Sequence, residues 1–180
     1  RMLIELMTET QRDQLGERLA IDFAYRSEVA GRFRVNAYRH ARGLAAAFRS
    51  IPDEIRTMES LDLPPCIKSI INRPKGLTLV TGPTGSGKST TLAAMVDHVN
   101  KTRKGHIITL EDPIEFIHEN RQCVMTQREI GSHTMSFKEG LKNALREDPD
   151  LILVGEMRDP ETISLALTAR EPGVQVFGTL

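Results

Sequence analysis

The sequence is poor in cysteine and aromatic residues and carries no net charge. Only two cysteines occur in 180 residues, Cys66 and Cys123, in no metal-ligand spacing, which argues against a disulfide scaffold or a cysteine zinc site. Tryptophan is absent, and 24 basic side chains balance 24 acidic ones, so no overall field attracts nucleic acid or anionic lipid. No apolar run is long enough to span a bilayer and no signal segment opens the sequence, so we expect a cytoplasmic chain.

The composition is that of an ordinary soluble globular protein, with 39% hydrophobic and 27% charged residues. The sequence begins at Arg1 and stops at residues 177–180, which read as the end of a buried strand, so we expect a fragment of a longer protein. Changes of pattern predict a partial α+β domain over residues 1–52, a linker over 53–65, and an α/β domain over 66–180 that is incomplete at its C-terminus.

The N-terminal block combines a helix with two strands. Thr8 opens a capping box, and the apolar face of the helix is expected to continue as far as Leu19. Over residues 31–39 apolar and polar side chains alternate, which predicts a half-buried strand with Arg32 and Arg34 on its open face. A second strand is expected over residues 44–51.

From residue 77 onward, strands and helices alternate, which predicts a parallel sheet. Strand 151–154 is apolar throughout, so we expect it to be buried on both faces. Asp159 before Pro160 predicts the start of a helix that runs to about Arg170. The expected strands are residues 77–81, 106–110, 151–154 and 174–178, and further helices follow the first strand and Ser136.

The most specific motif is the Walker A pattern G-x-x-x-x-G-K-[ST] over residues 82–89. Residue frequencies give it a chance of less than about 1% in a chain of this length. An apolar strand precedes it and an amphipathic helix follows it, as a phosphate-binding loop requires. The predicted nucleotide-binding residues are Gly82, Pro83, Thr84, Gly85, Ser86, Gly87, Lys88, Ser89 and Thr90.

The residue types of this loop explain its chemistry. Glycines let backbone N–H groups turn inward around a phosphate without steric conflict, and the following helix directs its positive end at the same anion. Lys88 is expected to reach the β- and γ-phosphates, and the Ser89 hydroxyl is a candidate Mg²⁺ ligand. The loop therefore predicts binding of ATP with Mg²⁺.

Two groups of carboxylates follow predicted strands. Glu156 stands after the buried strand 151–154 in a Walker B arrangement, although Gly155 occupies the place where many P-loop enzymes carry aspartate, so its contact with Mg²⁺ is expected to run through water. A second acidic cluster, residues 111–115, follows strand 106–110. Because parallel strands end at one edge of a sheet, both groups are expected to face the nucleotide, where a carboxylate can activate water.

Three stretches of sequence resemble the secretion ATPase superfamily. They are residues 80–91 (VTGPTGSGKSTT), 111–115 (EDPIE) and 144–159 (ALREDPDLILVGEMRD), and residues 22–23, 31–37 and 48–52 resemble the N-terminal domain of that family. The branch of type IV pilus retraction motors is the most similar. The resemblance implies a RecA-like P-loop core after a PAS-like domain, and a hexameric ring with ATP held between the domains.

The same resemblance assigns further roles. Glu115 is similar to the catalytic glutamate of the family's Asp box, Glu156 to its Walker B glutamate, and Arg34 and Arg49 to arginines that approach the γ-phosphate. The segment from Arg26 to Arg49 holds six arginines and one glutamate, so it carries a charge of about +5. Arginine suits recognition of phosphate, although a solvated basic hairpin is the simpler interpretation for the other arginines.

The sequence departs from the family in its His box. Residues 174–180 (VQVFGTL) begin with valine where the family usually has histidine, and they end before the second histidine of that motif. The five histidines of the chain, which have no metal-ligand spacing, are interpreted as structural: His40, His98, His106, His118 and His133.

The sequence thus predicts an Mg²⁺-dependent ATPase in a hexameric motor for pilus retraction, acting on a platform protein at the cytoplasmic face of the inner membrane. A motor of pilus extension or type II secretion is an alternative within the superfamily. A nucleic-acid translocase that uses Arg32, Phe33, Arg34 and Tyr38 is an alternative of another class, and a phosphotransferase is a third. The direction of force, the ring symmetry and the partner are left open by the sequence.

Overall fold

The structure, a computed structural model, describes residues 2–52, 54–169 and 173–180. The chain forms two compact units, Arg1–Asp53 and Glu54–Leu180. Asp53, the first residue of the expected linker, lies outside the described residues. Across the described residues no helix has the length and apolarity needed to cross a membrane.

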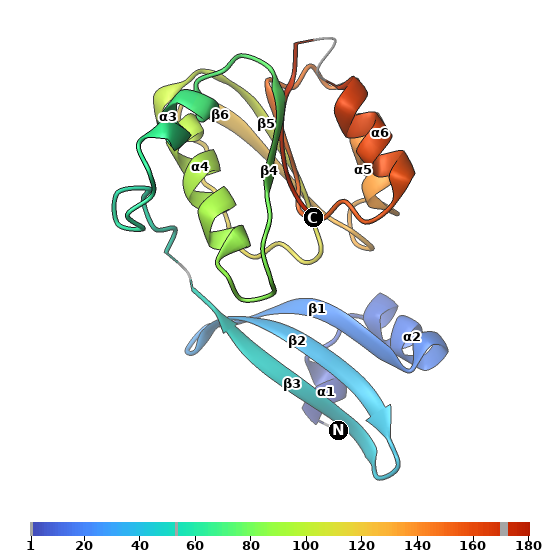
Figure 1. The fold of residues 1–180 in the computed structure, drawn as a ribbon. Helices are drawn as coiled ribbons and strands as arrows, with labels where there is room; N and C mark the ends of the chain where they lie inside the picture. The colour runs from blue at the N-terminus through green and yellow to red at the C-terminus, as the bar shows by residue number, and fades with distance from the viewer. Residues whose placement is uncertain (1, 53, 170–172) are drawn as a thin grey trace. The chain divides into compact units, whose positions relative to one another are not determined.

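The first unit is a three-stranded antiparallel sheet with two helices (Figure 1). Its strands lie in the order β1-β2-β3, and the buried core between sheet and helices includes Leu15, Phe23 and Val35. The elements are α1 (Met2–Glu5), α2 (Glu9–Arg18), β1 (Ala20–Ser27), β2 (Gly31–His40) and β3 (Gly43–Ile51).

The capping box of α2 is confirmed, and two other expectations for this unit are wrong. The Thr8 amide donates to Gln11 Oε1 at 2.9 Å, and the Gln11 amide donates to Thr8 Oγ1 at 3.3 Å. The helix ends at Arg18, and Leu19 takes a left-handed conformation (φ 64°) with 57% of its surface exposed, so it does not continue the helical face. Arg32, expected on the open face of its strand, is only 7% exposed.

The second unit is a five-stranded parallel sheet covered by helices on both faces (Figure 1). Its strand order is β4-β8-β7-β5-β6, so β8 is inserted between the strand before the Walker A loop and the strand before Glu156. The elements are α3 (Cys66–Ile71), β4 (Gly76–Val80), α4 (Lys88–Thr102), β5 (Gly105–Glu111), β6 (Cys123–Glu129), α5 (Phe137–Ala144), β7 (Leu151–Val154), α6 (Pro160–Thr168) and β8 (Gln175–Thr179).

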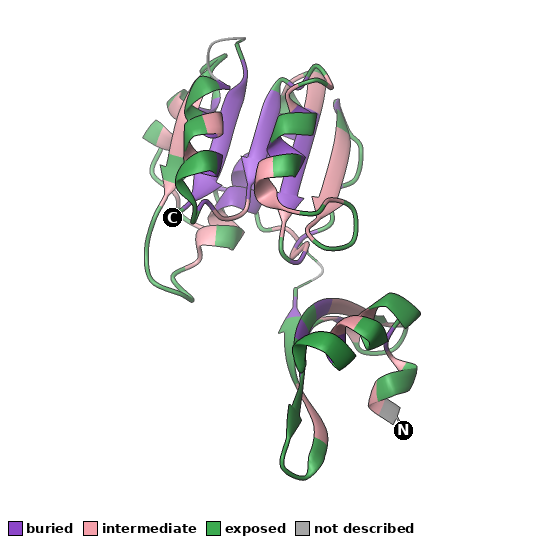
Figure 2. Cartoon of the chain, turned by 90° about the vertical axis from the view of Figure 1, so that its right-hand side faces the viewer, coloured by how far each residue is buried: buried purple, intermediate pink, exposed green. Residues whose placement is uncertain are grey.

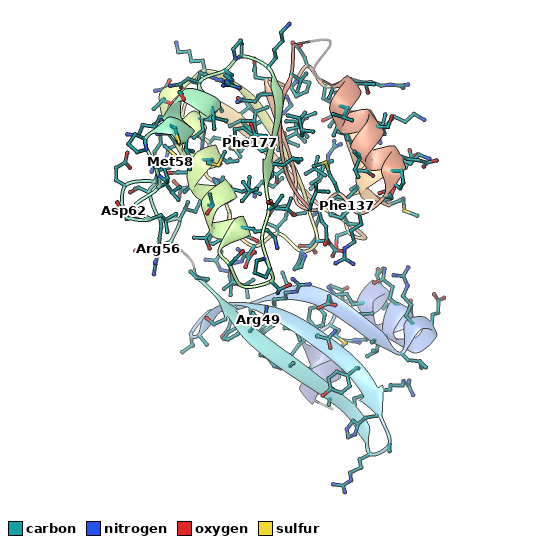
Figure 3. All side chains as sticks on the ribbon, in the orientation of Figure 1. Arg49, Arg56, Met58, Asp62, Phe137 and Phe177 are labelled. Atoms are coloured by element: carbon teal, nitrogen blue, oxygen red, sulfur yellow. The ribbon has the colours of Figure 1, made fainter. Side chains whose placement is uncertain are left out.

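Alternate side chains along each strand build two separate cores. Ile107 and Leu153 pack on one face with α4, together with the fully buried Phe177. Ile108 and Val154 pack on the other face with α5 and α6. Figure 2 shows buried residues concentrated in the strands of this sheet. Figure 3 shows the side chains on both faces of the sheet, with Phe177 labelled. All four residues of β7 are buried, as its uniformly apolar sequence predicts.

The expected strands of the second unit correspond to β4, β5, β7 and β8 within one residue at either end. Asp159 caps α6 by accepting a hydrogen bond from the Thr162 amide at 2.8 Å, with Pro160 in the first turn as expected. This helix ends at Thr168, and Arg170 lies outside the described residues. Strands β1 and β6 are not among the strands predicted from the sequence. Segment 54–65, expected as a linker, buries Met58 in the core beside α4.

Candidate nucleotide-binding site

The candidate site lies at the carboxyl edge of the parallel sheet. Strand β4 leads into residues 81–87 and then α4, β5 leads into the acidic segment 112–115, and β7 leads into Gly155 and Glu156. Because all five strands run in the same direction, these segments emerge at one edge of the sheet. The structure thus brings most of the predicted site residues together in one unit.

The backbone of the Walker A loop has a shape that glycine provides. Gly82, Gly85 and Gly87 have φ values of 152°, 81° and 89°, a range that residues with a side chain rarely adopt. A Cβ atom on Gly82 would also lie 2.7 Å from Ser86 Oγ. Alternation of such conformations turns successive backbone N–H groups toward a common centre, which forms an anion-binding concavity.

The helix after the loop is held firmly in the core. Leu92, Met95 and Val96 of α4 are each at most 2% exposed, so packing fixes the position of the helix N-terminus. Lys88 is the first residue of the helix, and its Nζ donates to Gly82 O at 2.6 Å and Pro83 O at 3.4 Å. The ammonium group therefore lies over the loop, beside the positive end of the helix dipole, and the residues fit a bound phosphate.

The end of β7 is tied to its neighbouring strands. The Gly155 amide donates to Leu110 O at 2.8 Å, and Thr179 Oγ1 donates to Gly155 O at 2.5 Å. A Cβ atom at position 155 would lie 3.1 Å from Leu110 O and 3.4 Å from Glu111 Cα. This crowding gives a physical reason for glycine in place of the more usual aspartate. Thr179 was not predicted as a site residue, although its place at the end of a buried strand is visible in the sequence.

Glu156 follows this fixed point and remains accessible. Its side chain is 41% exposed, and Oε1 lies 2.5 Å from Arg158 Nε. The Glu156 carboxylate, through a hydrogen bond and its charge, raises the pKa of the Arg158 guanidinium. The oxygen donors of Glu156 and of Ser89 at the start of α4 are of the kind that Mg²⁺ prefers. The donor set present at this edge therefore fits that ion.

Hydrogen bonds hold the acidic cluster after β5. Glu111 and Glu115 are both half-buried, and burial raises the pKa of the Glu111 carboxyl although hydrogen bonds from Thr109, Glu115 and Gln127 oppose the rise. Thr109 Oγ1 donates to Glu111 Oε1 at 2.7 Å, and the Glu115 amide donates to Glu111 Oε2 at 3.4 Å. The Glu111 carboxylate thus accepts hydrogen bonds from Thr109 and from the backbone of Glu115, which is the predicted catalytic glutamate of this cluster.

The two candidate arginines lie in the first unit. Arg34 of β2 and Arg49 of β3 are exposed and are direct partners in the antiparallel register. Arg34 Nε lies 3.5 Å from Asp22 Oδ1. The Walker A loop, Glu115 and Glu156 belong to the second unit, so the predicted site residues are distributed over both units.

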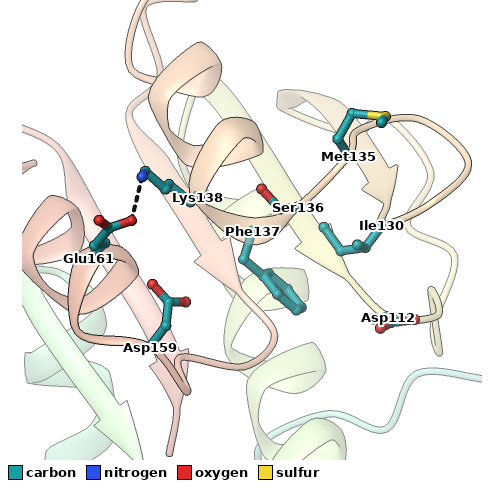
Figure 4. Close-up of a pocket in the computed structure, with 8 residues that line it drawn as sticks. All are labelled: Asp112, Ile130, Met135, Ser136, Phe137, Lys138, Asp159 and Glu161. Atoms are coloured by element: carbon teal, nitrogen blue, oxygen red, sulfur yellow. Dashed lines mark ion pairs between the residues drawn. The ribbon is translucent and has the colours of Figure 1, made fainter.

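A hollow of about 440 Å³ opens on the face of the sheet that carries α5 and α6, opposite to α4, where these two helices begin (Figure 4). Lys138, the basic side chain among its described lining residues, forms an ion pair with Glu161. No residue of the Walker A loop lines it. The lining residues are Asp112, Ile130, Met135, Ser136, Phe137, Lys138, Asp159 and Glu161.

Comparison with known proteins identifies close relatives. The chain is 54% identical over 179 residues to the type IV pilus retraction ATPase PilT of Pseudomonas aeruginosa, covering 99% of this chain and 52% of that protein. It is 53% identical over 179 residues to a twitching motility protein of Neisseria gonorrhoeae, covering 99% of this chain and 48% of that one. The chain thus spans about half the length of these relatives.

The fold is also that of a solved motor. A crystal structure of the pilus retraction motor PilT with bound ADP matches with a TM-score of 0.94 and 49% identity, covering 99% of this chain and 52% of that one. The RecA-like α/β fold expected from the sequence is therefore confirmed. The profile of the family described as "Type II/IV secretion system protein" matches residues 16–180. The chain belongs to the type II/IV secretion system protein family.

Proposed function

We propose that this chain is the nucleotide-binding and catalytic part of an ATP-hydrolysing motor that powers type IV pilus retraction and twitching motility. The observation that carries the proposal is the strand–loop–helix unit from β4 to α4, with positive-φ glycines and the Lys88 ammonium at the start of a buried helix. The relatives named for pilus retraction and twitching motility support the direction of the motor.

Each candidate residue then has a defined task. Backbone amides of residues 82–90 and the Lys88 ammonium hold the β- and γ-phosphates. Ser89, and Glu156 through water, would hold Mg²⁺, which when bound neutralises charge on the phosphates. Glu115 orients the attacking water and accepts its proton, which assists attack on the γ-phosphorus.

Arg34 and Arg49 supply positive charge from the first unit. Their guanidinium groups are suited to stabilising the charge that develops on the γ-phosphate oxygens during transfer. Release of that phosphate removes the anion to which they bind, so the first unit is free to rotate relative to the second. This change converts the chemistry of hydrolysis into movement.

For the whole protein we propose a homo-hexameric ring with ATP between the domains. The ring would sit as a peripheral assembly at the cytoplasmic face of the inner membrane and pass its movement to a pilus platform protein. A strain without the gene tests the direction of force. Loss of a retraction motor leaves pili on the cell surface and abolishes twitching, whereas loss of an extension motor leaves no pili.

The test of the site is ATP turnover by the full-length protein and its variants Lys88→Ala and Glu156→Ala. We expect turnover to fall at least about 100-fold in both, since Lys88 would bind the phosphates and Glu156 would help to hold the Mg²⁺ that neutralises their charge. Lys101→Ala is the matched control, because Lys101 lies on the same helix and pairs only with Asp97 at 2.7 Å among the ion pairs of the described residues. Full turnover in both site variants would refute the assignment.

A further inference from the structure

The segment that carries Glu115 has no regular secondary structure of its own. Between the end of β5 and the start of β6, residues 112–122 form neither helix nor strand. Buried backbone N–H and C=O groups need partners, so such a segment keeps one conformation only where side chains supply them. The identity of these side chains determines what positions Glu115.

Gln127 of β6 supplies two of these hydrogen bonds, and a third joins it to the Glu111 carboxylate. Its Nε2 donates to Phe116 O at 2.8 Å and to Glu111 Oε1 at 3.3 Å, and its Oε1 accepts from the His118 amide at 2.8 Å. The amide group of one side chain thus uses both its donor and its acceptor to fix the backbone on the C-terminal side of Glu115.

Two carboxylates fix the N-terminal side. Glu129 Oε2 accepts from the Ile114 amide at 3.0 Å, and Glu111 Oε2 accepts from the Glu115 amide at 3.4 Å. Glu111 and Glu129 are register partners at the ends of β5 and β6, and Gln127 is the partner of Thr109 two residues earlier. The supporting side chains therefore belong to the ends of two hydrogen-bonded strands and not to the segment itself.

These side chains lie on the face of the sheet that carries α4. Ile107 and Met125 belong to the core beside α4, and side chains two residues apart along a strand share a face. The same face therefore continues as Thr109 and Glu111 in β5, and as Gln127 and Glu129 in β6. This places the support for Glu115 on the side of the sheet where the Walker A loop leads into its helix.

From these contacts we infer that Gln127 is a positioning residue that holds Glu115 in place for hydrolysis. The inference rests on the proposed function, because it assigns a task to a side chain of the same site. The described hydrogen bonds of the Gln127 side chain go to Glu111 and to the backbone at Phe116 and His118, so Gln127 acts through these groups. Loss of its hydrogen bonds is expected to misplace Glu115 while leaving the Walker A loop intact, and small misplacements reduce rates strongly.

The test compares Gln127→Leu and Gln127→Glu with wild-type full-length protein. Leucine removes all three hydrogen bonds at similar volume, and glutamate loses both donor bonds and sets a second carboxylate against Glu111. We expect kcat for ATP to fall at least about tenfold in both, while KM and the affinity for Mg·ADP, measured with a fluorescent ADP analogue, stay within about twofold. Val124→Thr, at an exposed position of the same strand, is the control and should match wild type.

Amide hydrogen exchange gives a readout that does not depend on turnover. In Gln127→Leu the amides of Glu115 and His118 should exchange faster than in wild type, while those of α4 keep their protection. Wild-type kcat in Gln127→Leu, or a raised KM with unchanged kcat, would overturn the inference while the proposed function stands. Absence of both Mg·ADP binding and ATP turnover in wild type would overturn the proposed function, and with it this inference.

Discussion

Arg34 and Arg49 face each other directly across β2 and β3. Like charges at opposite positions of an antiparallel pair destabilise it, by roughly 0.2–1 kcal/mol. The Arg34 guanidinium lies 3.5 Å from Asp22, but both of those side chains are more than 40% exposed, so solvent weakens this compensation. An arrangement that places two exposed arginines at opposite positions of a strand pair, at a cost in stability, favours a role in binding an anion.

Arg49→Ala tests this arrangement. We expect ATP turnover by the full-length protein to fall at least about tenfold, because the guanidinium no longer stabilises charge on the transferred phosphate. The free energy of unfolding should stay the same or rise by up to about 1 kcal/mol, because the repulsion with Arg34 is relieved. Turnover assays and urea unfolding measure the two effects.

Arg42→Ala is the control for that variant. Arg42 is exposed in the turn between β2 and β3, and its replacement by alanine removes the same charge from the same hairpin. Turnover should remain at the wild-type level. An equal loss of turnover in Arg42→Ala and Arg49→Ala would mean that overall positive charge, and not a specific contact, accounts for the effect.

Gly82→Ala tests the shape of the Walker A loop. The added methyl group would approach Ser86 Oγ, and the φ of 152° is unfavourable for alanine. Strain of about 1–3 kcal/mol in the loop is expected to weaken nucleotide binding by about tenfold or more. Titration with a fluorescent ADP analogue measures this change.

The matched substitution is Gly16→Ala in α2. Apart from its chain neighbours and the backbone of the helix itself, no atom of the described residues lies within 4 Å of the position that the new Cβ would occupy, and the residue is inside a helix. Alanine should therefore stabilise the protein by about 0.5–1 kcal/mol without changing nucleotide affinity. If Gly82→Ala binds nucleotide as well as Gly16→Ala does, the loop does not need glycine at position 82.

The core strands and the Walker A loop could be predicted because each has a local signal. Strand β7 is uniformly apolar, and the helix after the loop repeats apolar residues at helical spacing. Strand β6 gave no such signal. It lies at the edge of the sheet, where Cys123 is its one fully buried residue, and its sequence CVMTQRE ends in polar and charged side chains.

The support for Glu115 could not be derived from the sequence for a related reason. Gln127 and Glu129 act on residues 114–118 only because β6 pairs in parallel with β5, and this pairing depends on the whole sheet. Burial of Arg32 was missed in a similar way, since alternation along β2 alone placed that residue on the open face. Local sequence patterns predict the secondary-structure elements, whereas contacts between elements depend on how the strands pair and in which register.

Glu115→Gln separates hydrolysis from binding. The amide has nearly the same shape as the carboxylate but does not accept a proton from water, so kcat should fall about 10²–10⁴-fold. Affinity for Mg·ADP should change less than about twofold, because the Walker A loop is untouched. Glu119→Gln is the control, since Glu119 is exposed and pairs with Arg121 at 2.8 Å. A parallel loss of nucleotide affinity in Glu115→Gln would contradict the role of Glu115 as a base.

His118 predicts how stability depends on pH. Its side chain lies in the segment after Glu115 and is 8% exposed, and Nδ1 has no hydrogen-bond partner among the described residues. Burial lowers the pKa of His118 to about 4, with a further lowering from Lys101 and an opposing effect of Asp97. The unfolded chain therefore takes up a proton near pH 6.5, whereas the folded protein does so only near pH 4.

The contribution of neutral His118 to the free energy of unfolding is therefore fully present above about pH 6.5. It decreases by up to about 3 kcal/mol as the pH falls toward 4. His118→Gln carries no titrating group, so its free energy of unfolding should fall less over this range than that of wild type. Urea unfolding at several values between pH 7.5 and 4.5 measures the difference. Ile117→Gln alters the exposed neighbour and should keep the wild-type slope. Equal slopes in wild type and His118→Gln would show that the imidazole takes up its proton in the folded protein as readily as in the unfolded chain.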